Sequence, residues 1–208
     1  MNKMKLLPVI ALLLAAGCQT TQPPQIAQQA ERTEPSTSHP FSEMRFPDEV
    51  GAFRKGEIKR YDRAGRDVSV AYNLARLGSA VAGTVYVYPA PIDVKVLPIP
   101  KVGEAPEWFV KNHTEEIKKQ IIQHHTGAQI LSEDDVEIDQ ASGMQKGRRV
   151  LFQYTENTPY GPQPFLSEML LFTHGKWFVK YRFTYLRDYK SVVRRDIDEL
   201  VEALKWPQ

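Results

Sequence analysis

The strongest constraint on the fold is a strict alternation of side chains over residues 177–185, where large apolar or aromatic residues stand at every second position. A period of two predicts a β-strand with one buried face. The run 165–172, apolar in part on both faces, precedes this segment, and the turn between them contains Gly175, which can adopt a positive φ angle. These residues predict an antiparallel hairpin, and its first strand is expected to be central in a sheet.

Similar signals predict further strands in both halves of the chain. Val68, Val70 and Tyr72 alternate on one face, and residues 84–88 are β-branched or aromatic. The acidic segment 131–138 has a pattern that leaves open a short strand or a solvated acidic loop. The strands predicted in addition to the hairpin lie at residues 56–61, 67–72, 84–88 and 146–154.

Two amphipathic helices are also predicted. Pro106 suits the first turn of a helix, and isoleucines recur at helical spacing up to a stop at Gly127, which predicts a helix over residues 106–126. Residues 189–204 carry one apolar stripe, and Pro207 lies beyond its end. The order of elements is thus three strands, a helix, three strands and a helix.

This order predicts an α+β fold in which an antiparallel sheet is flanked by helices. Residues 46–208 are long enough for one such domain. With the strands at 84–88 and 177–185 and the closing Leu-Lys-Trp-Pro, the chain resembles the PsbP-like fold. That fold is a helix–sheet–helix sandwich of photosystem extrinsic proteins and of bacterial lipoproteins of the DcrB-like kind. The resemblance implies an accessory, scaffold or assembly protein that is not an enzyme.

The N-terminal residues have the composition of a signal peptide. Lys3 and Lys5 precede a short apolar run that ends in Gly17 and Cys18. This arrangement resembles the signal class of bacterial lipoproteins, in which fatty acids such as palmitate are attached at the cysteine and the chain is cut just before it. The resemblance implies that residues 1–17 are removed and that Cys18 is lipidated. Ordinary secretion, with a free thiol left behind, is the alternative.

The residues after the cleavage site predict where the domain is held. Residues 18–45 are rich in Gln, Thr, Pro and Ser and have few large apolar side chains, which predicts a disordered tether. A flexible chain of this length spans roughly 30 Å. Gln19 stands where an Asp in lipoproteins commonly favours retention in the inner membrane. The resemblance therefore implies an N-terminal lipid anchor in the outer membrane of the bacterial cell envelope, with the domain facing the periplasm.

Charge and cysteine content exclude several classes of function. The chain has 27 basic and 25 acidic residues, and removal of the signal takes away Lys3 and Lys5, which leaves a balanced mature chain. Such a chain has no global basic field of the kind that binds nucleic acid. Cys18 is the only cysteine, so after lipidation neither a disulfide nor a thiol nucleophile is available. No cofactor is indicated, and the oligomeric state stays open.

Motifs for catalysis or metal binding are also missing from the sequence. No Gly-x-Ser-x-Gly elbow or phosphate-binding loop occurs, and the acidic run 133–139 lacks the glycine of a calcium-binding loop. We therefore predict neither catalytic residues nor a metal site, and an envelope hydrolase with a spatial triad stays open as an alternative. The histidines without ligand spacing are His113, His124, His125 and His174, the last of which is expected to be a solvated turn residue.

Residues 158–165 are the first candidate for recognition of a protein or envelope partner. Tyr160 lies among prolines in this segment, which ends at Phe165. An exposed tyrosine on a rigid loop loses little entropy on binding. The alternative is a stiff connection on which Tyr160 packs back.

Basic residues in the C-terminal half are the second candidate. Lys180 and Arg182 point away from the aromatic stripe of residues 177–185, and on an open face they would meet an anionic partner such as peptidoglycan or headgroups. The alternative is a charged face that is paired with acids or covered by a helix. A small-molecule carrier, with a cavity lined by the aromatic stripe, is a further possibility. The whole basic set is Lys146, Arg148, Arg149, Lys180, Arg182, Arg187, Arg194 and Arg195.

Overall fold

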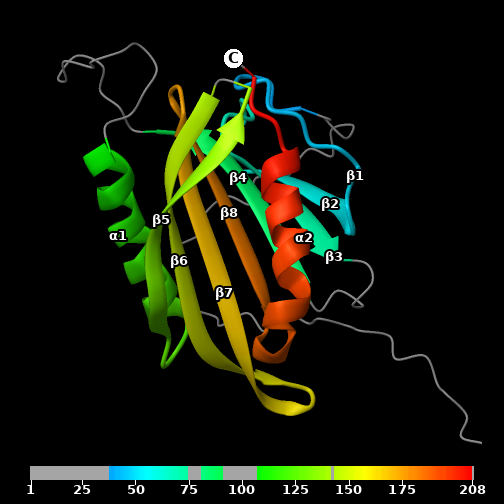
Figure 1. Cartoon of the computed structure of the whole chain (residues 1–208), viewed down its shortest axis with the longest axis vertical. Coiled ribbons are helices and arrows are strands. Elements are labelled where there is room, and N and C mark those ends of the chain that lie inside the picture. Colours follow the sequence, from blue (N-terminus) through cyan, green and yellow to red (C-terminus); the bar gives the residue numbers. More distant parts are fainter. Residues whose placement is uncertain (1–37, 75–80, 91–106, 142, 208) are drawn as a thin grey trace, which may run out of the picture. The chain divides into compact units, whose positions relative to one another are not determined.

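An open antiparallel sheet organises the protein, in the strand order β1-β2-β3-β4-β8-β7-β6-β5 (Figure 1). This computed structural model describes residues 38–74, 81–90, 107–141 and 143–207. The described elements are the strands β1 (Glu49–Val50), β2 (Phe53–Arg60), β3 (Val68–Leu74), β4 (Val81–Pro89), β5 (Gln129–Gln140), β6 (Gly143–Thr158), β7 (Gly161–His174) and β8 (Trp177–Leu186), and the helices α1 (Glu107–His124) and α2 (Lys190–Ala203).

The β7–β8 hairpin forms as the alternation predicts, and β7 lies in the interior of the sheet. Gly175 in its turn has a φ of 56°, a conformation that glycine adopts at little cost. β8 also pairs with β4, and this pairing joins the two halves of the chain into one sheet: Val85 lies opposite Tyr181. Both helices form within two residues of their predicted bounds.

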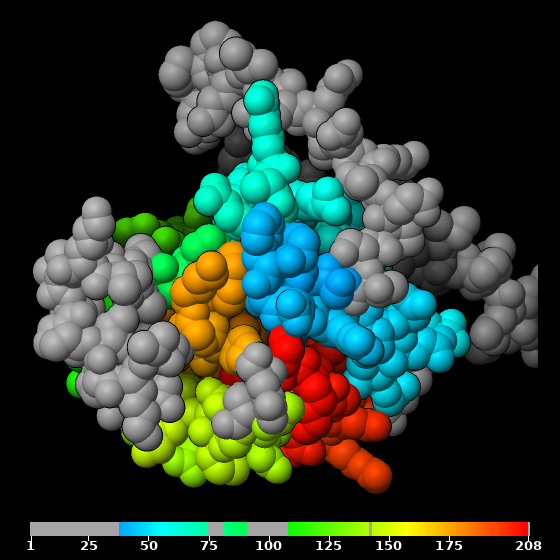
Figure 2. All heavy atoms as spheres, turned by 90° about the horizontal axis from the view of Figure 1, so that it is seen from above, coloured from blue at the N-terminus to red at the C-terminus, as the bar shows by residue number. Residues whose placement is uncertain are grey.

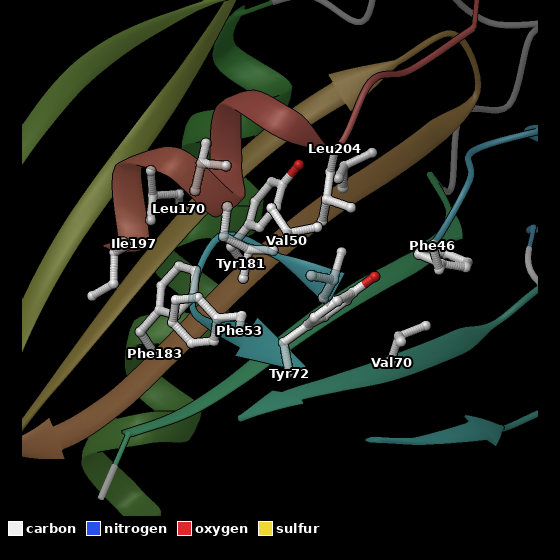
Figure 3. Close-up of a cluster of buried hydrophobic side chains, with 14 of the residues drawn as sticks. Phe46, Val50, Phe53, Val70, Tyr72, Leu170, Tyr181, Phe183, Ile197 and Leu204 are labelled. Atoms are coloured by element: carbon white, nitrogen blue, oxygen red, sulfur yellow. The ribbon is translucent and has the colours of Figure 1, made fainter. Parts of the chain in front are cut away.

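The two helices pack against opposite faces of the sheet, because successive strand residues point to opposite sides. Leu170 belongs to the cluster beneath α2, whereas its neighbour Leu171 belongs to the cluster beneath α1. Figure 3 shows the α2 cluster, in which Phe53, Phe183 and Ile197 lie together. The alternating aromatic residues of β8 belong to this cluster, so the stripe that a carrier cavity would require is packed core.

The acidic segment 131–138 is a strand rather than a solvated loop, and this strand is longer than predicted. It belongs to β5, a strand of 12 residues at one edge of the sheet, paired with β6 along its length. The acids are tolerated in a strand because basic residues stand beside them: Arg148 contacts Glu133 and Asp135. Charged side chains on an edge strand also oppose pairing with further strands.

The predicted loop 158–165 is shorter in the structure. Strand β7 already begins at Gly161, so the connection to β6 is the turn at Pro159 and Tyr160. Two prolines within the strand, Pro162 and Pro164, are accommodated because β8 ends opposite Phe165, which leaves this part of β7 with a neighbour on one side only.

The described part of the chain starts at residue 38, ahead of the predicted domain boundary at residue 46. Residues 38–45 form a small turn against the sheet, in which His39 and Met44 are each 1% exposed. His39 packs edge-on against Trp177 with a centroid separation of 4.8 Å. Figure 2 shows this blue segment beside the β7–β8 turn and the red C-terminal end. The signal segment, Cys18 and the rest of the predicted tether lie outside the described residues.

Neither of the helices within the described ranges is long and apolar enough to cross a membrane.

Candidate functional site

The face of the sheet that packs against α1 is divided into an apolar part and a polar part. The apolar part lies on β6, β7 and the start of β8, where Ile117 and Ile121 of α1 pack. The polar part continues across β8, β4 and β3, where the register places Lys180 opposite Tyr86 and Tyr86 opposite Ser69. We name the polar part the tyrosine–lysine face; it consists of Tyr61, Ser69, Tyr86, Tyr88, Lys180 and Arg182.

Lys180 stands between two aromatic rings of this face. Its Nζ lies 4.1 Å from the ring centroid of Tyr86 and 5.6 Å from that of Tyr88. Burial and, to a smaller extent, the charge of Arg182 lower the pKa of Lys180 while Asp67 raises it, and together they bring the pKa to about 8. Among the described residues Lys180 has no carboxylate in ion-pair contact, so the aromatic rings are its close neighbours.

Arg182 is held in place by two contacts across the sheet. Its Nε donates to Ser167 Oγ at 3.1 Å, and its Nη2 donates to His125 Nε2 at 3.0 Å. The other ring nitrogen of His125, Nδ1, lies 2.8 Å from a carboxylate oxygen of Glu156. Burial lowers the pKa of His125, and the adjacent guanidinium of Arg182 lowers it further. Neutral His125 therefore accepts from Arg182 and donates to Glu156.

Tyr88 is held by α1 in a similar way. Its hydroxyl lies 2.9 Å from Nε2 of His113, and Nδ1 of the same ring lies 3.2 Å from Glu116. The His113 ring also stacks on Phe178 at 4.3 Å between centroids. Burial lowers the pKa of His113 and raises that of Tyr88, which keeps both groups neutral near pH 7. Two histidines without ligand spacing thus act as supports beside the tyrosine–lysine face.

Most of the remaining basic residues of the C-terminal half have acidic partners. Arg149 and Arg194 both contact Glu168, a carboxylate whose side chain is only 3% exposed. Arg148 contacts two acids of β5, and Lys146 lies 3.9 Å from Glu137. Arg187 and Arg195 are exposed. Lys180 and Arg182 are therefore distinct, because they are partly buried and make no acidic ion pair among the described residues.

The other predicted recognition residues are separated by the structure. Tyr160 is 77% exposed at the tip of the β6–β7 hairpin, so it does not pack back. Thr158 stiffens this tip: its Oγ1 accepts from Tyr160 N at 3.1 Å and donates to Gly161 O at 2.8 Å. Phe165 is partly buried beneath α1, stacked with Tyr154 at 6.3 Å, and belongs to the core rather than to the tip.

Sequence reasoning overlooked a serine–histidine pair near the N-terminal end of the described chain. Ser42 Oγ donates to His39 Nδ1 at 2.7 Å, the geometry of a nucleophile with its base. However, Nδ1 also accepts from Ser42 N, and Nε2 donates to Arg66 O at 3.1 Å. Both residues are buried, and this set of bonds closes the 38–45 turn onto the loop after β2. The geometry favours a structural role for the pair.

His174 also differs from its prediction as a solvated turn residue. Its ring lies 5.7 Å from that of Trp206, and burial lowers its pKa. No group of three or more His, Cys, Asp or Glu residues in the described ranges is arranged to hold a metal ion.

Comparison with known proteins gives no relative for this chain. No protein-family model matches it, and neither a curated protein nor a solved structure does. Functional inference consequently depends on the residues of the chain and their geometry.

Proposed function

We propose that this protein is a lipid-anchored lipoprotein of the bacterial cell envelope, whose domain is a non-catalytic module that docks onto an envelope protein through the tip of the β6–β7 hairpin. The lipid is attached to Cys18 and inserts into the outer membrane, and the domain faces the periplasm. The element order predicted from the sequence resembles the PsbP-like fold, which implies an accessory role, although the described part of the structure has four strands rather than the predicted three before each helix. The observation that carries the docking proposal is Tyr160, an exposed aromatic side chain on a stiffened turn.

The physical reason is the low entropic cost of binding through such a tip. Tyrosine supplies a large contact area with few rotatable bonds, and tyrosines are enriched at the energetic centres of protein interfaces. Here the backbone beneath Tyr160 is fixed by both hydrogen bonds of Thr158. The two prolines in the adjoining part of β7 stiffen the ribbon further. A partner would therefore meet a tip that is already ordered.

The anchor is tested by metabolic labelling with a fatty acid. We expect the wild-type protein to incorporate label and to remain with the membrane fraction, and the Cys18→Ser variant to do neither. Stable attachment of this kind requires more than one acyl chain. Equal labelling of wild type and variant would refute the lipid anchor.

The docking tip is tested by in-cell photo-crosslinking from position 160, followed by identification of the captured protein. Position 144 is a matched control, because Met144 is also an exposed apolar residue near a strand connection, at 58% exposure. We expect one envelope protein to be captured from position 160 and not from position 144, and to be lost from pull-downs of the Tyr160→Ala variant. Equal capture from both positions, or unchanged pull-down by Tyr160→Ala, would remove the tip as the docking element.

A further inference from the structure

We infer that the tyrosine–lysine face is a second binding site, separate from the hairpin tip, and that its ligand is a sugar bearing a carboxylate. Lys180 and Arg182 would receive the carboxylate, and the tyrosines and Ser69 would contact the sugar. The site lies on the sheet beside α1, across β3, β4 and β8. It is independent of the lipid anchor and of the partner proposed above.

Lys180 and Arg182 form a pair of cations without a carboxylate in ion-pair contact among the described residues. The two cations stand two positions apart on β8, so their side chains lie on the same face of the sheet. Elsewhere in the described chain, partly buried arginines are neutralised: Arg148 contacts Glu133 and Asp135 in the same layer of side chains. Around Lys180 the opposing charge is Asp67, which acts on it without ion-pair contact. A local excess of positive charge is therefore built into an otherwise balanced protein.

Both cations keep N–H donors beyond those used in the described hydrogen bonds. Lys180 carries three N–H donors, but its close neighbours among the described residues are aromatic faces, which accept no conventional hydrogen bond. Arg182 uses Nε and Nη2 on Ser167 and His125, which leaves Nη1. A carboxylate can accept from both cations through its two oxygens, and charge-assisted hydrogen bonds of this kind are stronger than neutral ones.

Contacts with neighbouring side chains already order the tyrosine–lysine face. Arg182 is fixed by Ser167 and by the His125–Glu156 pair, and Tyr88 is fixed by His113. Tyr61 is fixed as well, since its hydroxyl lies 3.1 Å from Ser69 Oγ. Binding to groups held in this way costs less conformational entropy than binding to mobile side chains. These contacts hold the donors of Arg182 and the tyrosine hydroxyls on one surface. Charged side chains that only face solvent would not need to be held in this way.

The residues of this face suit a sugar better than a phosphate. Helix N-termini, backbone amide nests and bidentate arginine forks are the usual phosphate-binding devices. Here one ammonium and one arginine that is mostly engaged lie on strands among tyrosine rings and hydroxyl groups. Flat aromatic rings pack against the apolar face of a pyranose, and hydroxyls such as those of Tyr61 and Ser69 exchange hydrogen bonds with sugar hydroxyls.

The test is to titrate the purified mature protein with two sugars and to monitor binding through the NMR chemical shifts of its amides. N-acetylmuramic acid and N-acetylglucosamine differ by a carboxylate-bearing ether. We expect the acidic sugar to shift amides of β4 and β8, and to bind at least about tenfold more tightly than the neutral sugar, the factor typical of losing one charge-assisted contact. Lys180→Met should weaken binding by a similar factor, whereas Lys180→Arg, which keeps the charge, should retain most of it. Arg195→Gln, at an exposed arginine, is the control.

Two further titrations decide between ligand classes and exclude trivial charge effects. Inorganic phosphate and vesicles containing phosphatidylglycerol should not displace the acidic sugar at equal concentration, and displacement by either would overturn the assignment to a carboxylated sugar. Equal binding of the two sugars, or an equal loss of binding in Lys180→Met and Arg195→Gln, would overturn the site itself. The Tyr160→Ala variant should bind the acidic sugar normally, so failure of the docking proposal leaves this test unaffected.

Discussion

The two faces of the sheet are built differently. Beneath α2, apolar side chains extend across the sheet from Phe53 on β2 to Ile138 on β5, and Trp206 closes this layer at the C-terminal end. Beneath α1, the apolar layer covers only the β6–β7 part and the start of β8, and the rest of this face includes tyrosines, hydroxyls and the cations Lys180 and Arg182. The α2 face is thus a core over its whole width, whereas the α1 face is a core on one side and a polar surface on the other.

This difference separates stability from recognition. Burial of apolar area is the main favourable term in folding, so the α2 face should contribute more to stability. Partly buried cations contribute little to stability and have a cost of desolvation. The presence of Lys180 and Arg182 on this face is therefore better explained by binding than by folding. Paired substitutions, one on each face, test this division.

The largest difference in lost free energy of unfolding is expected between alanine variants of two tryptophans, one on each face. Trp206 is fully buried in the α2 face, where its indole N–H donates to the hydroxyl of Tyr181 at 3.2 Å. Trp206→Ala should lower the free energy of unfolding by about 3–5 kcal/mol, because it removes a large core side chain and leaves a cavity. Trp108 of α1 is 50% exposed, and Trp108→Ala should cost about 0.5 kcal/mol or less. Urea denaturation of both variants measures these losses; equal losses would contradict the division.

A smaller difference in lost free energy of unfolding is expected between glutamine variants of two carboxylates, one on each face. Glu168 is almost completely buried on the α2 face between Arg149 and Arg194, so Glu168→Gln leaves two cations without their counter-charge. Because both arginines are partly exposed to water, we expect a loss of about 2 kcal/mol, below the range for fully buried pairs.

The matched carboxylate is Glu133, which contacts Lys118 of α1 at 2.6 Å and Arg148 at 2.5 Å. Its side chain is more accessible than that of Glu168, and Glu133→Gln should cost about 0.5–1 kcal/mol. Thermal or chemical unfolding at low and moderate salt measures both variants. Added salt should reduce the effect at Glu133 more than the effect at Glu168, and the reverse order would show that Glu168 is the more solvated group.

The elements that local pattern specifies were predicted from the sequence, and those that depend on distant partners were not. The β7–β8 hairpin and both helices follow from periods of two and of about 3.6 residues. The acidic strand β5 does not, because the basic residues that allow it come from β6 and α1. The prolines of β7 are possible only because β8 ends opposite Phe165. That register cannot be predicted from the sequence of β7 or of β8 alone.

The candidate sites show the same limit. Alternation on β8 placed Lys180 and Arg182 on the face opposite the aromatic stripe of residues 177–185, and this prediction is confirmed. The neighbours that define the site, Tyr86 and Ser69, required the pairing of β4 with β8 and of β3 with β4. Residues 38–45 were assigned to the tether by composition, since a short segment with few apolar residues gives no sign that it packs against Trp177.

The smallest effect on stability is expected at Lys180, and it has the opposite sign. Burial lowers the pKa of Lys180 from 10.5 to about 8, so near pH 7 the folded protein holds a charge that its surroundings disfavour. Lys180→Met should therefore leave stability unchanged or raise it by about 1 kcal/mol, as replacement of poorly compensated buried charges often does. A loss of more than about 1 kcal/mol would mean that Lys180 is a structural residue.

The pH dependence distinguishes this explanation from simple repacking. Between pH 8 and 10.5 the unfolded chain keeps the proton on Lys180 while the folded protein has lost it, so the unfolded state binds more protons. The free energy of unfolding contributed by this group must then rise with pH over that interval. Raised tyrosine pKa values oppose this trend above pH 10, and the measurement therefore belongs between about 8 and 9.5. The rise should be present in the wild-type protein and in Arg195→Gln but absent in Lys180→Met; its persistence in Lys180→Met would assign it to another group and leave the desolvated charge of the α1 face without support.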